Sequence, residues 1–202
     1  ATSITLNATS GDLTITDDVH ANTAATSGST NVIMTATANA TLLLDGDLDV
    51  DHMRTVTMTA SNAGDIDVDG VVLTGVDAAG TDHVVSFTLT SDDQDSTINF
   101  DTGTASGAAV IDLITVVSGA GSTANVEETT ITNADTDVTI TTIDASAAAG
   151  DLTIVLTTSN DVVSITTGSG DATITSTTGA DTIVLGTGDN TVRTQDGQDT
   201  IT

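Results

Sequence analysis

Aspartate residues recur at a fixed spacing near the end of the sequence, where they could bind a hard cation. Asp181 and Asp199 stand eighteen residues apart, and so do Asp171 and Asp189. If eighteen residues complete one coil of the chain, each pair stacks at about 4.8 Å, the spacing of neighbouring strands. Two carboxylates that close repel by about 1 kcal/mol in bulk water and by more at a lower dielectric constant. A cation between the coils would turn this repulsion into a net attraction, and Ca²⁺ prefers carboxylate and carbonyl oxygens.

The spacing comes from a nine-residue repeat that runs from Thr167 to Thr202 without insertion or deletion. Written in nines it reads TGSGDATIT, STTGADTIV, LGTGDNTVR and TQDGQDTIT. An aliphatic residue occupies the eighth place, and the fourth place is always glycine: Gly170, Gly179, Gly188 and Gly197. A glycine-containing turn followed by a short strand with one inward aliphatic side chain is the unit of a parallel β-roll, in which two nonapeptides complete one coil.

The nonapeptide resembles the repeat of the RTX (repeat-in-toxin) family, G-G-x-G-x-D-x-U-x, in which U is a large aliphatic residue. The sixth place reads Val163, Ala172, Asp181, Asn190 and Asp199. The resemblance therefore implies that only the last three loops are competent to bind calcium. We expect Asp181 and Asp199 to bind it, helped by Asn190 and by the carbonyl oxygens of Gly179 and Gly197. The alternative is an ion-free coil in which Asp and Gly serve only as turn formers.

A second group of aspartates lies earlier, in two copies of a short motif. Residues 46–51 read GDLDVD and residues 64–69 read GDIDVD, again eighteen residues apart. Because alternate side chains of a strand share a face, one coil should stack three carboxylates over three of the next. The expected patch contains Asp47, Asp49 and Asp51 over Asp65, Asp67 and Asp69. Specific calcium sites and a solvated acidic face screened by salt are both compatible with this pattern.

The composition points to cations as partners. The net charge is −27, and the 29 acidic residues are almost all Asp. Glu would serve solubility equally well, whereas Asp is the shorter side chain that caps turns and chelates Ca²⁺. Arg54 and Arg193 are the only basic residues besides three histidines. Nucleic acid and anionic membranes are therefore excluded as partners, because phosphate binding needs many Lys or Arg. The absence of cysteine fits a secreted protein stabilised by metal rather than by disulfides.

Threonine alternates with aliphatic residues through much of the chain, which predicts short strands around a narrow core. The motif GDLTI occurs at Gly11 and Gly150 and returns as GDATI at Gly170. We expect an all-β fold, a parallel β-solenoid or β-roll in one elongated domain. Its coils should be irregular over residues 1–150 and regular over the nonapeptides of residues 151–202. No segment approaches the length of a transmembrane helix.

The middle of the chain carries a second resemblance. The stretches NVEETTIT (residues 125–132) and TTIDASAAAGDLTIVL (residues 141–156), followed by nonapeptides, resemble the crystalline region of bacterial RTX surface-layer proteins. The resemblance implies a secreted protein that self-assembles on the cell surface when calcium bridges coils and subunits. Because the chain begins Ala-Thr-Ser, we expect it to be a piece of a longer protein.

Catalysis finds little support in the sequence. There is no G-x-S-x-G nucleophile motif, and His20, His52 and His83 lack metal-site spacing and are expected in exposed turns. We therefore expect a non-enzymatic, extracellular, calcium-dependent segment of a bacterial surface layer, filament or matrix, whose partners are copies of itself. One alternative is an RTX adhesin segment that acts as a stiff spacer or binds a ligand, for example ice through a threonine ladder. Another is a cell-surface enzyme acting on polysaccharide, which two Phe and no Trp or Tyr argue against.

Overall fold

The structure is a computed structural model, and it describes all of the nonapeptide repeat, residues 167–202. The residues it describes are 3–9, 11–16, 19–21, 30–37, 40–50, 53–61, 65–73, 82–84, 86–91, 96–100, 109–118, 128–134, 138–156 and 160–202. None of these residues is helical, so no described helix could cross a membrane.

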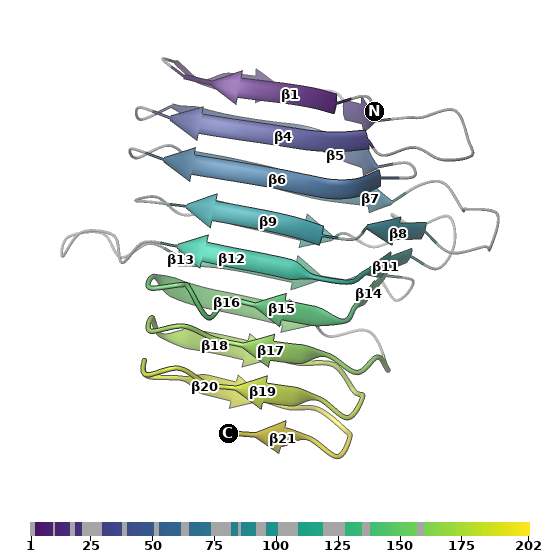
Figure 1. Ribbon diagram of the computed structural model, residues 1–202, viewed down its shortest axis with the longest axis vertical. Helices are drawn as coiled ribbons and strands as arrows, with labels where there is room; N and C mark the ends of the chain where they lie inside the picture. Colours follow the sequence, from purple (N-terminus) through teal and green to yellow (C-terminus); the bar gives the residue numbers. More distant parts are fainter. Residues whose placement is uncertain are drawn as a thin grey trace.

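The described strands form two large sheets between which the chain alternates (Figure 1). Sheet A contains β1 (Ser3–Ala8), β4 (Thr30–Thr37), β6 (Met53–Ser61), β9 (Ser86–Ser91), β12 (Ile114–Ser118), β15 (Thr142–Asp144), β17 (Ser164–Thr166), β19 (Thr182–Val184) and β21 (Thr200–Ile201). Sheet B contains β2 (Leu13–Ile15), β5 (Thr41–Val50), β7 (Asp65–Leu73), β10 (Ser96–Phe100), β13 (Glu128–Asn133), β16 (Asp151–Leu156), β18 (Ala172–Thr175) and β20 (Thr191–Arg193), with β3 (Val19–Ala21) beside β5.

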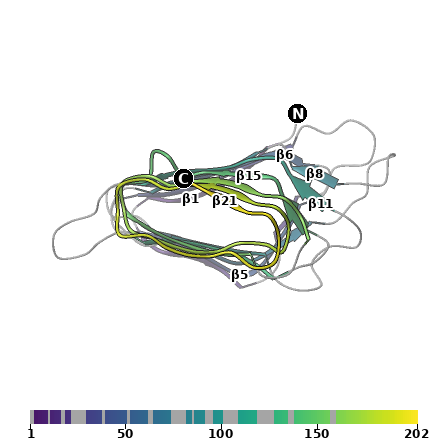
Figure 2. The same ribbon diagram turned by 90° about the horizontal axis from the view of Figure 1, so that it is seen from below.

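Neighbouring described strands in both sheets pair in parallel, and the two sheets face each other as two flat layers (Figure 2). A third, three-stranded sheet of β8 (Asp82–Val84), β11 (Ala109–Ile111) and β14 (Val138–Ile140) lies to one side of the middle strands. We call one passage of the chain through sheet A and sheet B a coil. The prediction of an all-β protein with long parallel sheets is confirmed, and the arrangement is consistent with the expected solenoid.

The core lies between the two layers and is built from the alternation that the sequence shows. In β16 the residues Leu152, Ile154 and Leu156 are buried, while the residues between them are partly exposed. In sheet A, Met34 pairs with Met58, and Met58 pairs with Leu89, so buried side chains of successive coils stack in a column. The core is narrow because each strand contributes only a few inward side chains.

The coils differ in length along the chain, as the sequence predicts. Strands β4 to β7 are eight to ten residues long, whereas β17, β19 and β20 have three residues each. In the nonapeptide region Ile165 pairs with Ile183 and Ile183 with Ile201, which is a constant step of eighteen residues. The strands that follow Gly11, Gly150 and Gly170 all lie in sheet B, so the repeated GDLTI-like motif marks the same part of a coil each time.

Candidate cation-binding turns

The aspartates of the nonapeptides lie in turns at two opposite edges of the layers (Figure 2). The A-to-B turns lead from sheet A to sheet B and include residues 167–171 and 185–190. The B-to-A turns lead back and include residues 160–163, 176–181 and 194–199. Asp171, Asp189 and Asn190 are in A-to-B turns, whereas Asp181 and Asp199 are in B-to-A turns.

Asp181 is a buried carboxylate that joins two coils. It is only 1% exposed, and its Oδ1 accepts a hydrogen bond of 3.0 Å from the N–H of Val163 in the preceding coil. The hydroxyl of Thr177 in the same turn lies 2.8 and 3.0 Å from the two carboxylate oxygens and 2.5 Å from the carbonyl oxygen of Asp161, so these acceptors share its single proton. These donors stabilise the negative charge within the protein, which offsets the repulsion expected between stacked aspartates.

The same bond recurs at the sixth place of each later nonapeptide. Asp199 Oδ1 accepts the N–H of Asp181 at 3.0 Å, and Asn190 Oδ1 accepts the N–H of Ala172 at 3.1 Å. The amide of Asn190 also donates to the carbonyl oxygens of Gly186 and Gly188. The sixth-place side chain is therefore the acceptor that ties each of these turns to the coil before it, and Asn serves as well as Asp.

The fifth-place aspartates make the bond in the opposite direction along the stack. Asp171 Oδ1 accepts the N–H of Asp189 in the following coil at 2.7 Å. Asp151 Oδ1 accepts the N–H of Asp171 in the same way, at 3.1 Å. The sequence analysis missed Asp151, although the pair Gly150–Asp151 repeats as Gly170–Asp171 and Gly188–Asp189 and could have identified it.

The predicted stacking is confirmed in the nonapeptide region, and glycine makes it possible. A Cβ added to Gly179 would overlap the carbonyl group of Asp161, and one added to Gly197 would overlap that of Gly179. Gly197 also has a φ of 134°, a conformation that favours glycine. The glycines predicted as carbonyl ligands thus let successive B-to-A turns approach closely, which brings Asp181 and Asp199 into adjacent layers.

Asn190 does not join Asp181 and Asp199, contrary to the expectation from the sequence. Nine residues are half a coil, so Asn190 lies in the turn between β19 and β20, at the edge opposite to Asp181 and Asp199. Its neighbours are instead the A-to-B residues Gly186 and Gly188. A cation held by Asp181 and Asp199 would therefore have to find its remaining ligands among B-to-A residues.

The prediction that the two GDXDVD motifs stack is wrong. β5 and β7 are neighbours in sheet B, but Thr41 pairs with Asp65 and Leu43 with Asp67. Past a β-bulge, Asp47 pairs with Gly70 and Asp49 with Val72. The side chains of these aspartates and of Asp69 are outside the described residues, and Asp51 is outside them altogether.

The register follows from coil length and core packing rather than from the motif. The strands of this region are two to three times longer than those of the nonapeptides, so one coil needs more than eighteen residues. Buried Leu42 and Leu44 pair with Ile66 and Val68, which fixes aliphatic residues over aliphatic ones. A slip that restored the predicted stacking would break this match.

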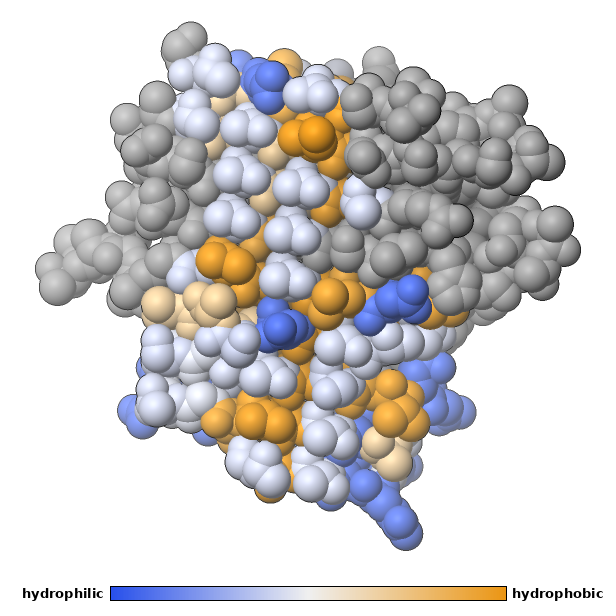
Figure 3. Space-filling view, viewed as in Figure 1, coloured by the Kyte–Doolittle hydropathy of each residue, from blue (hydrophilic) through white to orange (hydrophobic). Residues whose placement is uncertain are grey.

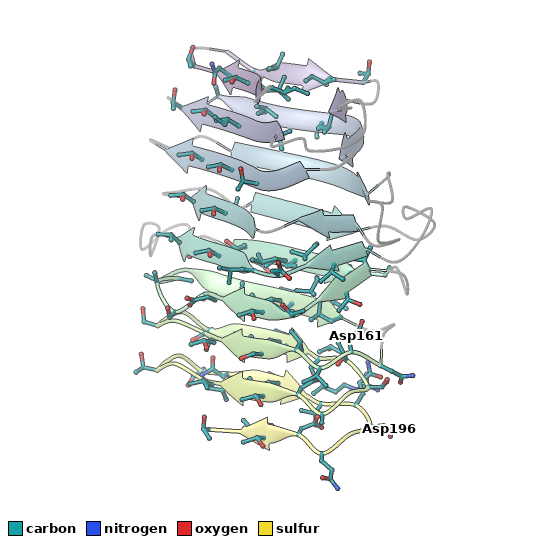
Figure 4. The ribbon with its side chains drawn as sticks, turned by 45° about the vertical axis from the view of Figure 1, so that its right-hand side comes forward. Asp161 and Asp196 are labelled. Atoms are coloured by element: carbon teal, nitrogen blue, oxygen red, sulfur yellow. The ribbon has the colours of Figure 1, made fainter. Side chains whose placement is uncertain are left out.

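Two further aspartates lie at the B-to-A edge (Figure 4). Asp161 occupies a fourth place, where the later repeats have glycine, and its Oδ2 accepts the hydroxyl of Thr139 at 2.9 Å. Asp196 is exposed in the last of these turns. Both add negative charge to the edge that holds Asp181 and Asp199.

Asp144, at the end of β15, shows how a local donor tunes one of the acidic groups. Ser146 donates its hydroxyl at 2.6 Å and its N–H at 3.0 Å to Asp144 Oδ1. These bonds hold the pKa of Asp144 below its usual value, since they favour the ionised form, while slight burial opposes them. Asp144 lies outside the predicted metal residues.

Within the part of the chain that the structure describes, no group of three or more His, Cys, Asp or Glu side chains is placed so that it could hold a metal ion. Comparison of the chain with protein-family models, curated proteins and solved structures found no match.

Proposed function

We propose that this chain is a non-catalytic structural segment, a β-solenoid that calcium stiffens and that assembles with copies of itself at the bacterial cell surface. The observation that carries the proposal is the placement of Asp181 and Asp199 at the same point of successive B-to-A turns. The backbones of these turns approach so closely that only glycine fits at Gly179 and Gly197. Carboxylate and carbonyl oxygens from two coils thus lie at one edge, which is the ligand chemistry that Ca²⁺ prefers.

Electrostatics favours cation uptake along the whole edge. Asp161, Asp181, Asp196 and Asp199 lie within the B-to-A turns, in a chain with 29 acidic residues and two arginines. The hydrogen bonds of Asp181 and Asp199 occupy some of their oxygen lone pairs, but a carboxylate has about four such sites and can accept further partners. Calcium bound there would reduce repulsion between coils and add bonds between them, so binding would stabilise the folded stack.

The hydrogen bonds of the aspartates support a structural role. Four of the described aspartates, Asp151, Asp171, Asp181 and Asp199, accept backbone N–H groups from a neighbouring coil. Side chains that a catalytic site would leave free for substrate are used here to hold the stack together. The resemblance of the middle region and the nonapeptides to RTX surface-layer proteins supports secretion and assembly at the cell surface.

The test is a calcium titration of the purified chain at constant ionic strength, followed by far-ultraviolet circular dichroism and light scattering. The parent is compared with the double variant Asp181→Asn/Asp199→Asn. Asparagine keeps the acceptor oxygen, as Asn190 does at the equivalent place, but removes the charge. The double variant Asp12→Asn/Asp112→Asn removes the same number of charges outside the nonapeptides and outside sheet A and is the matched control.

We expect calcium, but not an equal ionic strength of NaCl, to raise both the β signal and the scattering of the parent and of the control. The Asp181→Asn/Asp199→Asn variant should need at least ten-fold more calcium. If calcium changes neither signal in the parent, the proposal is wrong. If calcium stabilises a protein that stays monomeric, the self-assembly part is wrong and the chain is better described as a calcium-stiffened spacer of an adhesin.

A further inference from the structure

We propose that two copies of this chain associate face to face through the outward surface of sheet A. The inference deepens the self-assembly proposed above and rests on it. It names the outward surface of sheet A, which carries little charge, rather than the acidic turns, as the place where copies meet.

The outward surface of sheet A has an unusual composition for so acidic a chain. Among the side chains that the structure describes, those pointing outward from sheet A are Thr, Ser, Asn, Ile or Val, and Asp144 is the single charged one. Figure 3 shows this surface as a pale and orange strip with blue patches confined to a few places. A chain with a net charge of −27 thus keeps one broad surface almost free of charge.

The surface is also regular. Thr57 pairs with Thr88 and Thr88 with Thr115, while Thr35 pairs with Thr59 and Thr59 with Thr90. These two columns place hydroxyl and methyl groups about 4.8 Å apart along the stack and about 6.8 Å apart across it. Because the layer is flat (Figure 2), a second surface of the same kind can approach it over its whole length.

Charge identifies the occupant as a second copy. The other described surfaces carry more charged groups: the outward side chains of sheet B include Glu128, Asp151 and Arg193, and the turns carry Asp161, Asp189 and Asp196. Two identical chains that met through the turns would place like charges together, and two that met through sheet B would remove three charged groups of each copy from water, and both disfavour association. A basic partner, by contrast, would be drawn to the acidic edges and away from sheet A. Sheet A, with Asp144 as its single described outward charge, is where two copies meet at the lowest electrostatic cost.

The size of the surface is sufficient for a weak but specific interface. Nine strands span about 38 Å at roughly 4.8 Å each, and three columns of outward side chains about 6.8 Å apart span about 14 Å. A face-to-face dimer would therefore cover about 530 Å² on each copy, or about 1,060 Å² in total, just above the roughly 1,000 Å² that a specific protein interface needs. Ile33, Val117 and Val184 are 37%, 37% and 41% exposed on this surface and would supply its apolar contacts.

The test introduces charge into the surface and compares it with charge placed elsewhere. Thr57→Glu/Thr88→Glu places two carboxylates in neighbouring strands of sheet A. Thr173→Glu/Thr191→Glu does the same on exposed, paired positions of sheet B and is the matched control. The third variant, Thr57→Lys/Thr88→Lys, places the opposite charge on sheet A. Circular dichroism confirms folding, and sedimentation velocity with and without calcium measures association.

We expect the sheet A glutamate variant to associate at least ten-fold more weakly than the parent, and the sheet B variant to associate like the parent. An equimolar mixture of the glutamate and lysine variants should recover association, because opposite charges then meet across the interface. If the sheet A glutamate variant misfolds, Val117→Glu takes its place at an exposed position.

The outcomes separate this inference from the proposed function. If the parent associates and the sheet A variants associate equally well, self-assembly stands and the sheet A interface is wrong. If the parent stays monomeric with and without calcium, both the interface and self-assembly are wrong. Association of the glutamate variant that is weakened but not recovered in the mixture would also contradict face-to-face docking.

Discussion

At the scale of single residues, the main structural role of Asp171, Asp181 and Asp199 is to accept hydrogen bonds from the backbone of a neighbouring coil. Asp181 has its carboxylate buried against the N–H of Val163 and the hydroxyl of Thr177. A buried N–H that loses its acceptor costs about 1–3 kcal/mol, so the choice of side chain at the sixth place bears directly on stability. Asn190 shows that the acceptor oxygen, rather than the charge, meets this structural need.

This role leads to a prediction for Asp181. Asp181→Ala should lower the free energy of unfolding by about 1–3 kcal/mol in chelator, because the N–H of Val163 loses its partner. Asp181→Asn should cost less than half as much. Asp189→Ala, at an exposed carboxylate, is the control and should be nearly neutral. Denaturant unfolding measures all three, and equal losses for the alanine and asparagine variants of Asp181 would contradict the hydrogen-bond account.

Asp144 gives a prediction about pH. Its pKa is lowered in the folded state by the hydroxyl and N–H of Ser146, so its stabilising contribution is present at neutral pH and is lost as pH falls through the folded pKa. Ser146→Ala removes the hydroxyl donor and should raise the pKa of Asp144. Titration of the Asp144 carboxyl by NMR measures the change, and Ser169→Ala, at an exposed serine in the adjacent turn of the next coil, is the control. An unchanged pKa in Ser146→Ala would show that the hydroxyl bond does not form in solution.

At the scale of strands and turns, the sequence predicts structure best where the repeat is strict. The nonapeptides predict an eighteen-residue step, and Asp181 over Asp199 and Asp171 over Asp189 follow correctly from it. The GDXDVD motifs show the same offset but do not stack, since the register there depends on strand length and on a β-bulge. A short motif does not reveal the register, because the register depends on how many residues lie in the strands and turns between the two copies of the motif.

The hydrogen-bond partners of the candidate site were harder to predict than its position. Thr177 carries no signature that separates it from the many other threonines of the chain, and Asp151 is distinguished from the other aspartates only by its place after Gly150. Their roles depend on which carboxylate points toward which coil, and that direction differs between the fifth and sixth places. Side-chain direction in a turn is set by the backbone of the neighbouring coil, which the sequence of one repeat does not contain.

Glycine in the turns gives a prediction at this scale. Gly11 and Gly170 begin similar motifs in the same sheet, but a Cβ at Gly170 would overlap the carbonyl of Gly150, whereas at Gly11 it would meet nothing within 4 Å. Gly170→Ala should therefore destabilise the fold by about 1–3 kcal/mol. Gly11→Ala should be neutral or stabilise it by up to about 1 kcal/mol. Thermal unfolding compares the two, and a similar effect of both changes would contradict the close approach of successive turns.

At the scale of the whole molecule, the fold brings many negative charges close together. Few basic groups are present to balance a net charge of −27, and the stacked turns place carboxylates of successive coils near one another. Screening should therefore stabilise the protein strongly. Cations that bind at specific places should act at far lower concentration than those that only screen.

The corresponding prediction concerns salt. Raising NaCl from about 0.01 to about 0.15 M shortens the screening length from about 30 to about 8 Å and should raise the melting temperature in the absence of calcium. The Asp12→Asn/Asp112→Asn variant, which has two fewer charges, should show a smaller rise. Thermal melts followed by circular dichroism give both values. A melting temperature that falls with salt would show that repulsion between the carboxylates does not limit stability.

The most direct test of the central claim is calorimetric titration of the chain with CaCl₂ at constant ionic strength, alongside MgCl₂. Stacked carboxylates that form calcium sites predict a saturable binding isotherm for Ca²⁺ that is much weaker for Mg²⁺, because Mg²⁺ demands a stricter geometry and releases its water reluctantly. The isotherm should lose sites or affinity in Asp181→Asn/Asp199→Asn but not in Asp12→Asn/Asp112→Asn. Equal, non-saturating responses to both cations, unchanged by either variant, would mean that the turn aspartates only join coils by hydrogen bonds and that calcium has no specific site here.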